Sequence, residues 1–398
     1  MLLPILRLKT PRNSRHPWIF RKMVQPRRGA GLEPGSLVEV RDRSGAFVGR
    51  AFYHPENTIA LRLLTENPAE EIDPGFFLRR LALARDLRQA TLDLPRLGDS
   101  WRLAHAEADA LPGMMIDKYA DTLLIQPFAA GWLHVMDWLI AALAELFPDC
   151  RPAIRADARA AEKEGVSFAD LERKYPPPSR ADISENGIKY RVDFGAGHKT
   201  GFFLDQRDNR ARAAGLARGR DVLDLCSYSG GFALSAWKGG ARAVEAVDLD
   251  EAALAAAAEN LRLNRTGGKI RLTHADAFEV CRQHRAAGRR HDLVILDPPK
   301  LAGSLEETEK ALKTYYDLNL AALGVAAPGG FFITCSCSGA VPEERWRQQV
   351  RRAAAAAGLG LTIFHAGGPG ADHPVASDFP QGRYLKALFA RVDGRQAG

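Results

Sequence analysis

Short runs in which hydrophobic and polar residues alternate dominate the first 65 positions of the chain. Residues 36–41, 46–53 and 59–64 each have the two-residue period of a half-buried strand, and Ser44 and Gly45 form a turn signal between the first two runs. This pattern predicts a small β-barrel or sandwich.

The pattern becomes mixed between residues 67 and 180, where we expect a central α+β domain. Residues 76–92 and 132–147 have helical spacing, and residues 122–128 fit a strand. The polar side of the first helix is expected to carry Arg79, Arg80, Arg85 and Arg88. Three consecutive prolines at 176–178 can neither continue a helix nor donate ladder hydrogen bonds, so they predict a linker at the end of this region.

From residue 221 onward, hydrophobic strands alternate with amphipathic helices. This alternation predicts a doubly wound, Rossmann-like α/β sheet. The last strand, residues 384–392, follows the strand at 361–364 without a helix long enough for a parallel crossover, so we expect it to be antiparallel and the sheet to be mixed.

A hairpin and the linker set the expected domain boundaries. Asn186-Gly187 between two strand-like runs predicts a β-hairpin that precedes the α/β sheet. We therefore expect three domains, at residues 1–66, 67–180 and 181–398.

Length and composition agree with several packed domains. The 398 residues are 46% hydrophobic and 26% charged, which suits a globular chain with more than one core. Five cysteines are too few, and odd in number, for a disulfide framework, so we expect reduced thiols. No apolar run reaches the roughly 18 residues that cross a bilayer, and the first residues lack the apolar core of a signal peptide. These features predict a cytoplasmic protein without a membrane partner.

Basic residues are concentrated near the N-terminus of a chain whose formal net charge is +7, and no acidic residue precedes Glu33. Such a surface attracts a polyanion, because each neutralised phosphate releases condensed counterions. Aromatic residues lie between the basic ones, as in surfaces that combine phosphate contact with base stacking. The alternative is a solvated basic face whose aromatic residues belong to the core. The candidate RNA contacts are Arg15, His16, Arg21 and Lys22.

The turn after the first strand of the α/β region is the expected nucleotide site, since ligands of such sheets bind at the carboxyl ends of the strands. Residues 224–232, with the sequence DLCSYSGGF, do not match the glycine pattern of a dinucleotide site. Asp224 would repel a pyrophosphate and attract a cation. S-adenosylmethionine (SAM), which carries a sulfonium and an ammonium group and no phosphate, therefore fits better than NAD.

Two further acids end the next two strands. Asp248 stands where a carboxylate accepts the ribose hydroxyls, and Asp276 stands where adenine would lie, with Phe278 placed to pack on the ring. Each of these acids alone could be only a helix N-cap. Three acids on successive strand ends favour a methyl-donor site, and we predict no metal site. Around these acids, the other candidate cofactor contacts are Ser227, Tyr228, Gly230, Leu249 and Ala277.

The fourth and fifth strands carry the candidate reactive groups. The fourth ends in Asp297-Pro298-Pro299-Lys300, a stiff turn that could hold the edge of a flat base. The fifth ends with Cys335 and Cys337, and strand alternation points both side chains the same way. We prefer Cys337 because it lies farther toward the mouth of the pocket. Both thiols could instead be small core residues.

A thiolate at this position suits the methylation of cytosine at carbon 5. That carbon is a poor nucleophile until a thiolate adds to carbon 6 and makes the ring an enamine. The enamine takes the methyl group, the carbon 5 proton is removed, and the thiolate leaves. The candidate catalytic residues are Cys337, Asp297, Pro298 and Lys300, and Asp297 is also a candidate cofactor contact.

With these residues in view, the chain resembles the bacterial family of 23S ribosomal RNA (cytosine-5)-methyltransferases with an N-terminal PUA domain. The resemblance covers nearly the whole chain and rests on an ordered set of motifs, each of them weak alone. They are HPWIF at 16–20, LPG at 111–113, HKTGFFLDQR at 198–207, SYSGGF at 227–232, DPPK at 297–300, SCSG at 336–339, ADHP at 371–374 and YLK at 384–386.

The resemblance implies a PUA domain, a central α+β domain and a class I methyltransferase domain built on a seven-stranded mixed sheet. It also implies SAM as cofactor, 23S ribosomal RNA as substrate and Cys337 as nucleophile. By the same comparison, Gln206 and Arg207 lie beside SAM, and Lys199 lies near RNA. The turn at Asp297 lacks the second cysteine of another branch of RNA cytosine-5 methyltransferases, so the group that assists release of the product stays open.

Other functions remain compatible with the sequence. A methyltransferase that acts on a base nitrogen would use the Asp297 turn without a thiol. An RNA-binding protein that no longer catalyses would bind RNA but not SAM. An NAD-dependent oxidoreductase is the least favoured, because the glycine pattern is missing. A homodimer is also compatible with the chain.

Overall fold

The structure is a computed structural model that describes residues 3–25, 31–195 and 201–394. Contacts within the chain divide it into two compact units. Unit 1 contains Met1–Ala181 with Asp372–Gly382, and unit 2 contains Asp182–Ala371 with Arg383–Gly398. No pattern in the sequence indicated that residues 372–382 would belong to unit 1. The three domains expected at 1–66, 67–180 and 181–398 stay a prediction.

The N-terminal part of unit 1 is a five-stranded sheet, as the alternating pattern predicted. The strand at one edge of this sheet, residues 5–7, pairs in parallel with its neighbour, residues 36–41. All other neighbouring strands of the sheet pair in antiparallel fashion. Inward-facing Val38, Val40, Ala51 and Leu61 form its core. In spatial order the strands are β1 (Ile5–Arg7), β3 (Ser36–Arg41), β4 (Phe47–Tyr53), β5 (Ile59–Thr65) and β2 (Trp18–Phe20).

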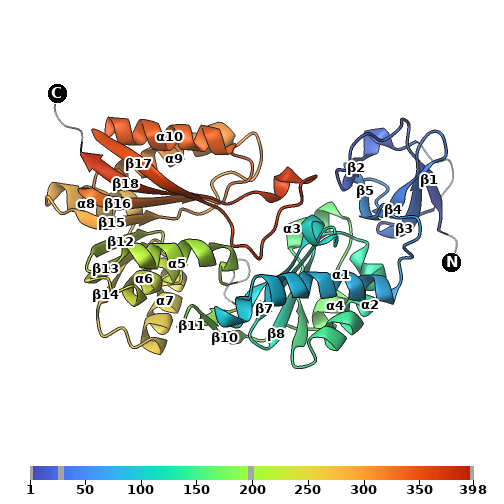
Figure 1. Ribbon diagram of the computed structural model, residues 1–398, viewed down its shortest axis with the longest axis horizontal. Coiled ribbons are helices and arrows are strands. Elements are labelled where there is room, and N and C mark those ends of the chain that lie inside the picture. Colours follow the sequence, from blue (N-terminus) through green and yellow to red (C-terminus); the bar gives the residue numbers. More distant parts are fainter. Residues whose placement is uncertain (1–2, 26–30, 196–200, 395–398) are drawn as a thin grey trace. The chain divides into compact units, whose positions relative to one another are not determined.

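The central part of unit 1 has the expected α+β composition. A four-stranded sheet lies beside α1 and α2 (Figure 1). The buried rings of Phe76, Phe77 and Trp132 belong to the core of this part. The strands, in spatial order, are β6 (Ser100–His105), β7 (Met114–Tyr119), β8 (Thr122–Pro127) and β9 (Arg151–Ile154). The helices are α1 (Pro74–Asp86), α2 (Trp132–Leu146), α3 (Ala158–Lys163) and α4 (Ala169–Lys174).

Arg88 is not on the polar side of a helix, and the prediction for this residue was wrong. The α-helix ends at Asp86 and one π-helical turn follows, which turns Arg88 into the interior, where it is fully buried. Its guanidinium donates to both carboxylate oxygens of Asp109, at 2.6 and 2.8 Å, and to the backbone oxygen of Asp372 at 2.8 Å. The buried Asp372 carboxylate in turn accepts the backbone N–H of Arg102 at 2.8 Å. These bonds fix residues 372–382 within unit 1.

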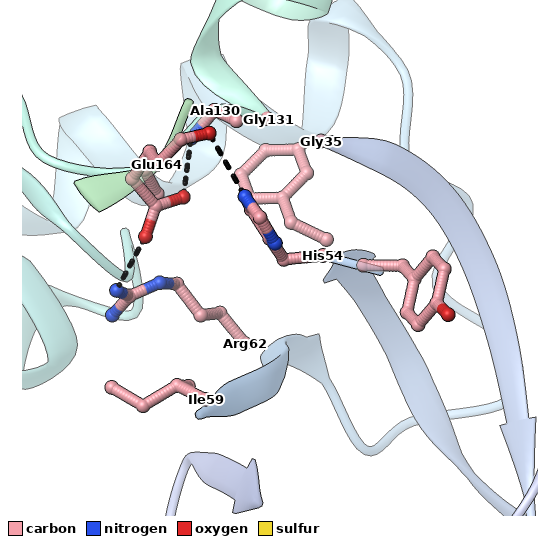
Figure 2. A pocket seen from close by; sticks show the side chains of 10 residues that line it. Gly35, His54, Ile59, Arg62, Ala130, Gly131 and Glu164 are labelled. Atoms are coloured by element: carbon pink, nitrogen blue, oxygen red, sulfur yellow. Dashed lines mark hydrogen bonds and ion pairs between the residues drawn. The ribbon is translucent and has the colours of Figure 1, made fainter. Parts of the chain in front are cut away.

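A small pocket in unit 1 lies between the five-stranded sheet, residues 129–131 before α2 and Glu164 after α3, and Figure 2 shows its lining. The buried Glu164 carboxylate accepts hydrogen bonds from Arg62 at 3.1 Å, Asn57 at 2.9 Å and the backbone N–H of Ala130 at 2.9 Å. Its backbone oxygen lies 2.9 Å from Nε2 of His54. Glu164 therefore joins the sheet to the central part of the unit, and none of the predicted catalytic or cofactor residues lines this pocket.

We expect Glu164→Ala to destabilise the protein by about 2–4 kcal/mol, because it leaves a largely buried guanidinium without its nearest carboxylate. Urea unfolding followed by circular dichroism measures the effect. Glu162→Ala, an exposed position in α3, is the matched control and should shift the midpoint very little. Equal midpoints for the two variants would contradict this account of Glu164.

Unit 2 begins with the predicted hairpin, formed by β10 (Arg180–Glu185) and β11 (Ile188–Asp193). Asn186 and Gly187 have φ values of 50° and 73°. Two consecutive positive φ angles are what a two-residue turn between twisted strands requires, and asparagine and glycine adopt them with the least strain.

A seven-stranded sheet forms the body of unit 2 and confirms the mixed α/β fold. Its first five strands are parallel, and β18 runs antiparallel to both of its neighbours, as predicted for the last strand. In spatial order the strands are β14 (Ile270–His274), β13 (Ala243–Asp248), β12 (Asp221–Leu225), β15 (His291–Leu296), β16 (Ala326–Ser336), β18 (Lys386–Gly394) and β17 (Leu359–Gly367).

Helices cover both faces of this sheet (Figure 1). On one face lie α5 (Arg207–Leu216), α6 (Gly231–Lys238) and α7 (Glu251–Leu263), and on the other lie α8 (Ala277–Ala286), α9 (Thr308–Leu323) and α10 (Glu343–Ala356). The parallel strands all end at the same edge, which gathers the predicted site residues there. Within the described residues, no helix combines the length and apolar character that a membrane span requires.

Candidate active site

The turn after β12 has a constrained backbone. Cys226, Tyr228 and Gly230 all have positive φ, at 61°, 49° and 81°. For the two residues with a side chain this conformation costs on the order of 1 kcal/mol or more each. The turn is held by the neighbouring strand, since the N–H of Ser227 donates to Val247 at 2.9 Å and the N–H of Tyr228 donates to Asp248 Oδ2 at 2.7 Å. Such strain concentrates at binding sites, which agrees with the place predicted for the cofactor.

Asp224 is a buried acid at the end of β12. Its exposed fraction is 0%, and neither carboxylate oxygen has a hydrogen-bond partner of ordinary geometry among the described residues. Burial and repulsion from Asp297 raise the pKa of Asp224 well above its ordinary value, and the backbone N–H of Ala233 opposes this rise more weakly. A buried carboxylate without a partner is costly unless a cation pairs with it. The ammonium group of SAM is a cation of the right kind.

The four predicted aspartates lie around one point. Burial raises the pKa of the Cys226 thiol, and the charges of Asp248, Asp297, Asp224 and Asp276 all act on this thiol and raise its pKa further. The tips of β12, β13, β14 and β15 therefore converge as the sequence indicated. A field of this sign favours a positively charged ligand and disfavours a pyrophosphate.

Asp248 and Asp276 differ in what they already bind. Asp248 accepts two backbone N–H groups, from Tyr228 at 2.7 Å and Asp250 at 2.9 Å. Asp276 is exposed and caps α8 through Oδ1, which is the structural role that the sequence left open for it. Beside them, Leu249 and Phe278 are 64% and 40% exposed. Two exposed apolar side chains at strand ends are suited to cover a flat ring such as adenine.

Gln206 and Arg207 lie at the start of α5, and both are buried. The Gln206 amide donates to Asp297 Oδ1 at 3.0 Å, and its oxygen accepts from Asn209 at 2.6 Å. Gln206 therefore orients the Asp297 carboxylate at the end of β15. Lys199, which was predicted to lie near RNA, is outside the described residues.

The structure distinguishes the two cysteines that strand alternation could not. Cys335 is fully buried within β16, and burial together with the charge of Asp297 raises the pKa of its thiol. Cys337 follows the last residue of the strand and is partly exposed, with Sγ 4.0 Å from the backbone oxygen of Pro298. The thiol and the Asp-Pro-Pro-Lys turn are thus adjacent, and the Lys300 side chain of that turn is exposed.

Tyr315 was not predicted from the sequence, yet it fixes the segment around Cys337. This buried residue of α9 hydrogen-bonds Ser336 Oγ at 2.8 Å and Ser338 Oγ at 2.9 Å, on the two sides of Cys337. Ser338 Oγ also accepts the N–H groups of Leu301 and Ala302. One network therefore joins the cysteine segment to the chain after the Pro-Pro turn. A tyrosine within a helix has no local signature of this role, so the sequence could not show it.

The predicted RNA contacts of the N-terminal sheet have different surroundings. Arg15 and Lys22 are exposed, whereas Arg21 donates to the backbone oxygens of His54 and Asn57. His16 accepts the N–H of Trp18 at 3.1 Å, and its ring centroid lies 5.4 Å from that of Phe379. Arg21 and His16 thus have partners within unit 1, and Arg15 pairs with Glu66 at 3.5 Å while its side chain stays exposed. Lys22 and the exposed part of Arg15 keep the clearest access to a polyanion.

The fold and the site define a class I SAM-dependent methyltransferase. A family model described as S-adenosylmethionine-dependent methyltransferase matches residues 173–359, and one described as PUA-like domain matches residues 10–66. The chain is 40% identical to the ribosomal RNA large subunit methyltransferase I of Tolumonas auensis over 381 residues, which cover 95% of this chain and 96% of the relative. The same-named protein of Shewanella amazonensis is 39% identical, with 96% of each chain covered. The chain therefore belongs to the family of large subunit ribosomal RNA methyltransferase I.

Solved structures share the fold over almost the whole chain. A candidate SAM-dependent methyltransferase from Streptococcus mutans aligns with a TM-score of 0.78 at 20% identity, covering 98% of this chain and 100% of that protein. A candidate methyltransferase complexed with SAH aligns with the same TM-score and coverage at 21% identity. At this identity the comparison supports the arrangement of strands and helices, and SAM as the cofactor rests on the matching family model.

Proposed function

We propose that this protein methylates carbon 5 of a cytosine in 23S ribosomal RNA, with Cys337 as the nucleophile. The relatives are named for methylation of large subunit ribosomal RNA, which gives the substrate class. The observation that supports this chemistry is the position of the Cys337 thiol, which is partly exposed at the end of β16. The thiol lies next to the Asp297 turn, at the same edge of the sheet as the acidic strand ends.

The acidic strand ends would hold SAM. Asp224 suits the ammonium group because its buried carboxylate has no cation beside it among the described residues. Asp248 suits the ribose hydroxyls, and Leu249 with Phe278 suits the adenine ring. When bound, SAM supplies a methyl group on a positively charged sulfur. Of the other candidate contacts, Ser227, Tyr228 and Gly230 lie in the turn after β12, Asp276 and Ala277 lie at the start of α8, and Gln206 and Arg207 lie at the start of α5.

Cys337 acts on the base. Its thiolate adds to carbon 6 of the cytosine, which moves electron density to carbon 5 so that this carbon can accept a methyl group. Asp297, which accepts a hydrogen bond from Gln206, and the backbone oxygen of Pro298, 4.0 Å from the thiol, would hold the edge of the base. Loss of the carbon 5 proton then restores the double bond and releases Cys337.

Product analysis tests the proposal. Ribosomal RNA incubated with the protein and SAM is digested to nucleosides, and mass spectrometry should find 5-methylcytidine. A methyl group on a base nitrogen would instead support the alternative that uses the Asp297 turn without a thiol. Salt-sensitive RNA binding with no SAM binding in calorimetry would support the non-catalytic alternative.

The exposed basic residues Arg15 and Lys22 are proposed to contact the phosphates of the RNA, with Lys199 as a further contact. The concentration of positive charge near the N-terminus supports this placement. The cytoplasm as the compartment and a homodimer as the assembly likewise stay predictions.

A further inference from the structure

Lys386 is a buried cation next to the segment that carries Cys337. It is the first residue of β18, lies opposite Ser336 in the antiparallel pairing with β16, and has an exposed fraction of only 4%. Burying an ammonium group is costly, so its surroundings must contribute specific partners. Lys386 lies within one of the sequence motifs, YLK at 384–386, to which no role was assigned.

The ammonium group binds the turn that follows the cysteine. Nζ donates to the backbone oxygen of Ser338 at 2.7 Å and to that of Val341 at 2.9 Å. Ser338 directly follows Cys337, so the positive charge is held one residue from the thiol. Both acceptors are neutral carbonyls, and within the part of the chain that the structure describes no carboxylate is hydrogen-bonded to Lys386. Electrostatic interaction links Lys386 with Cys337 and, more weakly, with Glu343.

Charged and titratable groups of other elements also face this region. Asp297 at the end of β15 acts electrostatically on Tyr315 and Cys335, and Glu343 at the start of α10 acts on Lys386. Negative charges in this region oppose the formation of a thiolate. Tyr315 of α9 has its pKa raised to about 12 by burial, so it stays neutral at physiological pH and donates or accepts hydrogen bonds only. Lys300 is a second cation, but its side chain is exposed and its charge is screened by solvent.

We propose that Lys386 is a positioning residue that holds the turn after Cys337 and stabilises the thiolate form of Cys337 by its positive charge. This inference rests on the proposed function, in which the thiolate attacks the base. Lys386 accepts no proton and forms no covalent bond in this role. Its positive charge lowers the free energy of the thiolate relative to the thiol. Burial lowers the pKa of Lys386 to about 8 although Cys337 and Glu343 oppose this shift, so the lysine is still mainly protonated at neutral pH.

Two variants separate the charge from the hydrogen bonds. Lys386→Arg keeps the positive charge, whereas Lys386→Gln keeps N–H donors for the carbonyls of Ser338 and Val341 and removes the charge. The rate of alkylation by iodoacetamide is measured as a function of pH, with mass spectrometry of the Cys337 peptide. The Cys150 peptide of unit 1 serves as the internal control.

We expect Lys386→Gln to raise the apparent pKa of Cys337 by about one unit and Lys386→Arg to restore most of this shift, with Cys150 unchanged. The acidic limb of the pH profile for methyl transfer should move by the same amount. An unchanged thiol pKa in a folded Lys386→Gln protein would overturn the inference. If that variant does not fold, the wild-type protein decides, because a Cys337 pKa at or above the ordinary value of about 8.5 would also overturn it.

The same data distinguish failure of this inference from failure of the proposed function. Full methyl transfer by Cys337→Ala would remove the thiol from the mechanism. The pKa of the Cys337 thiol, measured by alkylation in the proteins that keep Cys337, would still report on Lys386. An inactive Cys337→Ala together with an unshifted thiol pKa in Lys386→Gln would leave the nucleophile in place and reject only the role of the lysine.

Discussion

Cys337→Ala should lower methyl transfer to ribosomal RNA by about 10⁴-fold or more, because without the thiolate carbon 5 of cytosine has no route to become nucleophilic. Transfer of tritium from labelled SAM to the RNA measures the effect. Binding of SAM should change less than twofold, since Cys337 lies at the end of β16 and the acidic strand ends belong to β12, β13 and β14. The loss would thus belong to the chemical step.

Cys335→Ala is the matched control for this experiment. Its thiol is fully buried in β16, so the substitution removes a small core group and should cost about 1 kcal/mol of stability with little change in turnover. Turnover above a tenth of the wild-type value in Cys337→Ala, or an inactive but folded Cys335→Ala, would contradict the assignment of the nucleophile.

Asp224→Asn should weaken SAM binding by about 10- to 150-fold, which corresponds to the loss of a charged hydrogen bond of about 1.5–3 kcal/mol. The same variant should be more stable than the wild-type protein when SAM is absent, because it no longer buries a carboxylate without a partner. Calorimetric titration and thermal unfolding measure the two effects. Few substitutions are expected to raise stability and lower affinity together.

The gain in stability should depend on pH. The folded-state pKa of Asp224 is raised, so the wild-type protein loses stability as the pH rises above the unfolded-state value of about 3.9. The difference between Asp224→Asn and wild type should therefore be present at pH 7 and should vanish below about pH 3.5. A difference that stayed constant over this range would contradict a buried, costly carboxylate.

Asp221→Asn is the control on the same strand. Asp221 lies at the other end of β12, is paired with Arg242 at 2.6 Å, and has its pKa lowered by that hydrogen bond. Its replacement should leave SAM affinity unchanged and should reduce stability slightly above the unfolded-state pKa, which is the opposite sign from Asp224→Asn.

Several features of the site could be predicted because they depend on neighbours in the sequence. The β12, β13 and β14 strands and the helices after them have clear hydrophobic periods, so the acids at 224, 248 and 276 could be placed at strand ends and expected at one edge. The hairpin at Asn186-Gly187 is local in the same way. The antiparallel last strand followed from the short connection before it.

Other features of the fold and the site depend on contacts between segments that are distant in the sequence. The hydrophobic period of a single helix or strand does not indicate which segments make such contacts. Arg88 fits the polar side of a helix, but Asp109 and residue 372 meet it in the interior. Alternation gives Cys335 and Cys337 the same direction, and only the packing around β16 buries one thiol and leaves the other accessible.

The amino-acid sequence by itself determined the α/β and β-rich regions, the acidic strand ends and the pair of cysteines, because the hydrophobic period and the turn residues act within a few positions of each other. The tertiary structure alone decided that residues 372–382 belong to unit 1, that Tyr315 and Lys386 fix the segment around Cys337, and that Asp224 is fully buried. These outcomes depend on contacts between segments that are distant in the sequence and on which side chains those contacts shield from water. Both are decided only when the whole chain has packed.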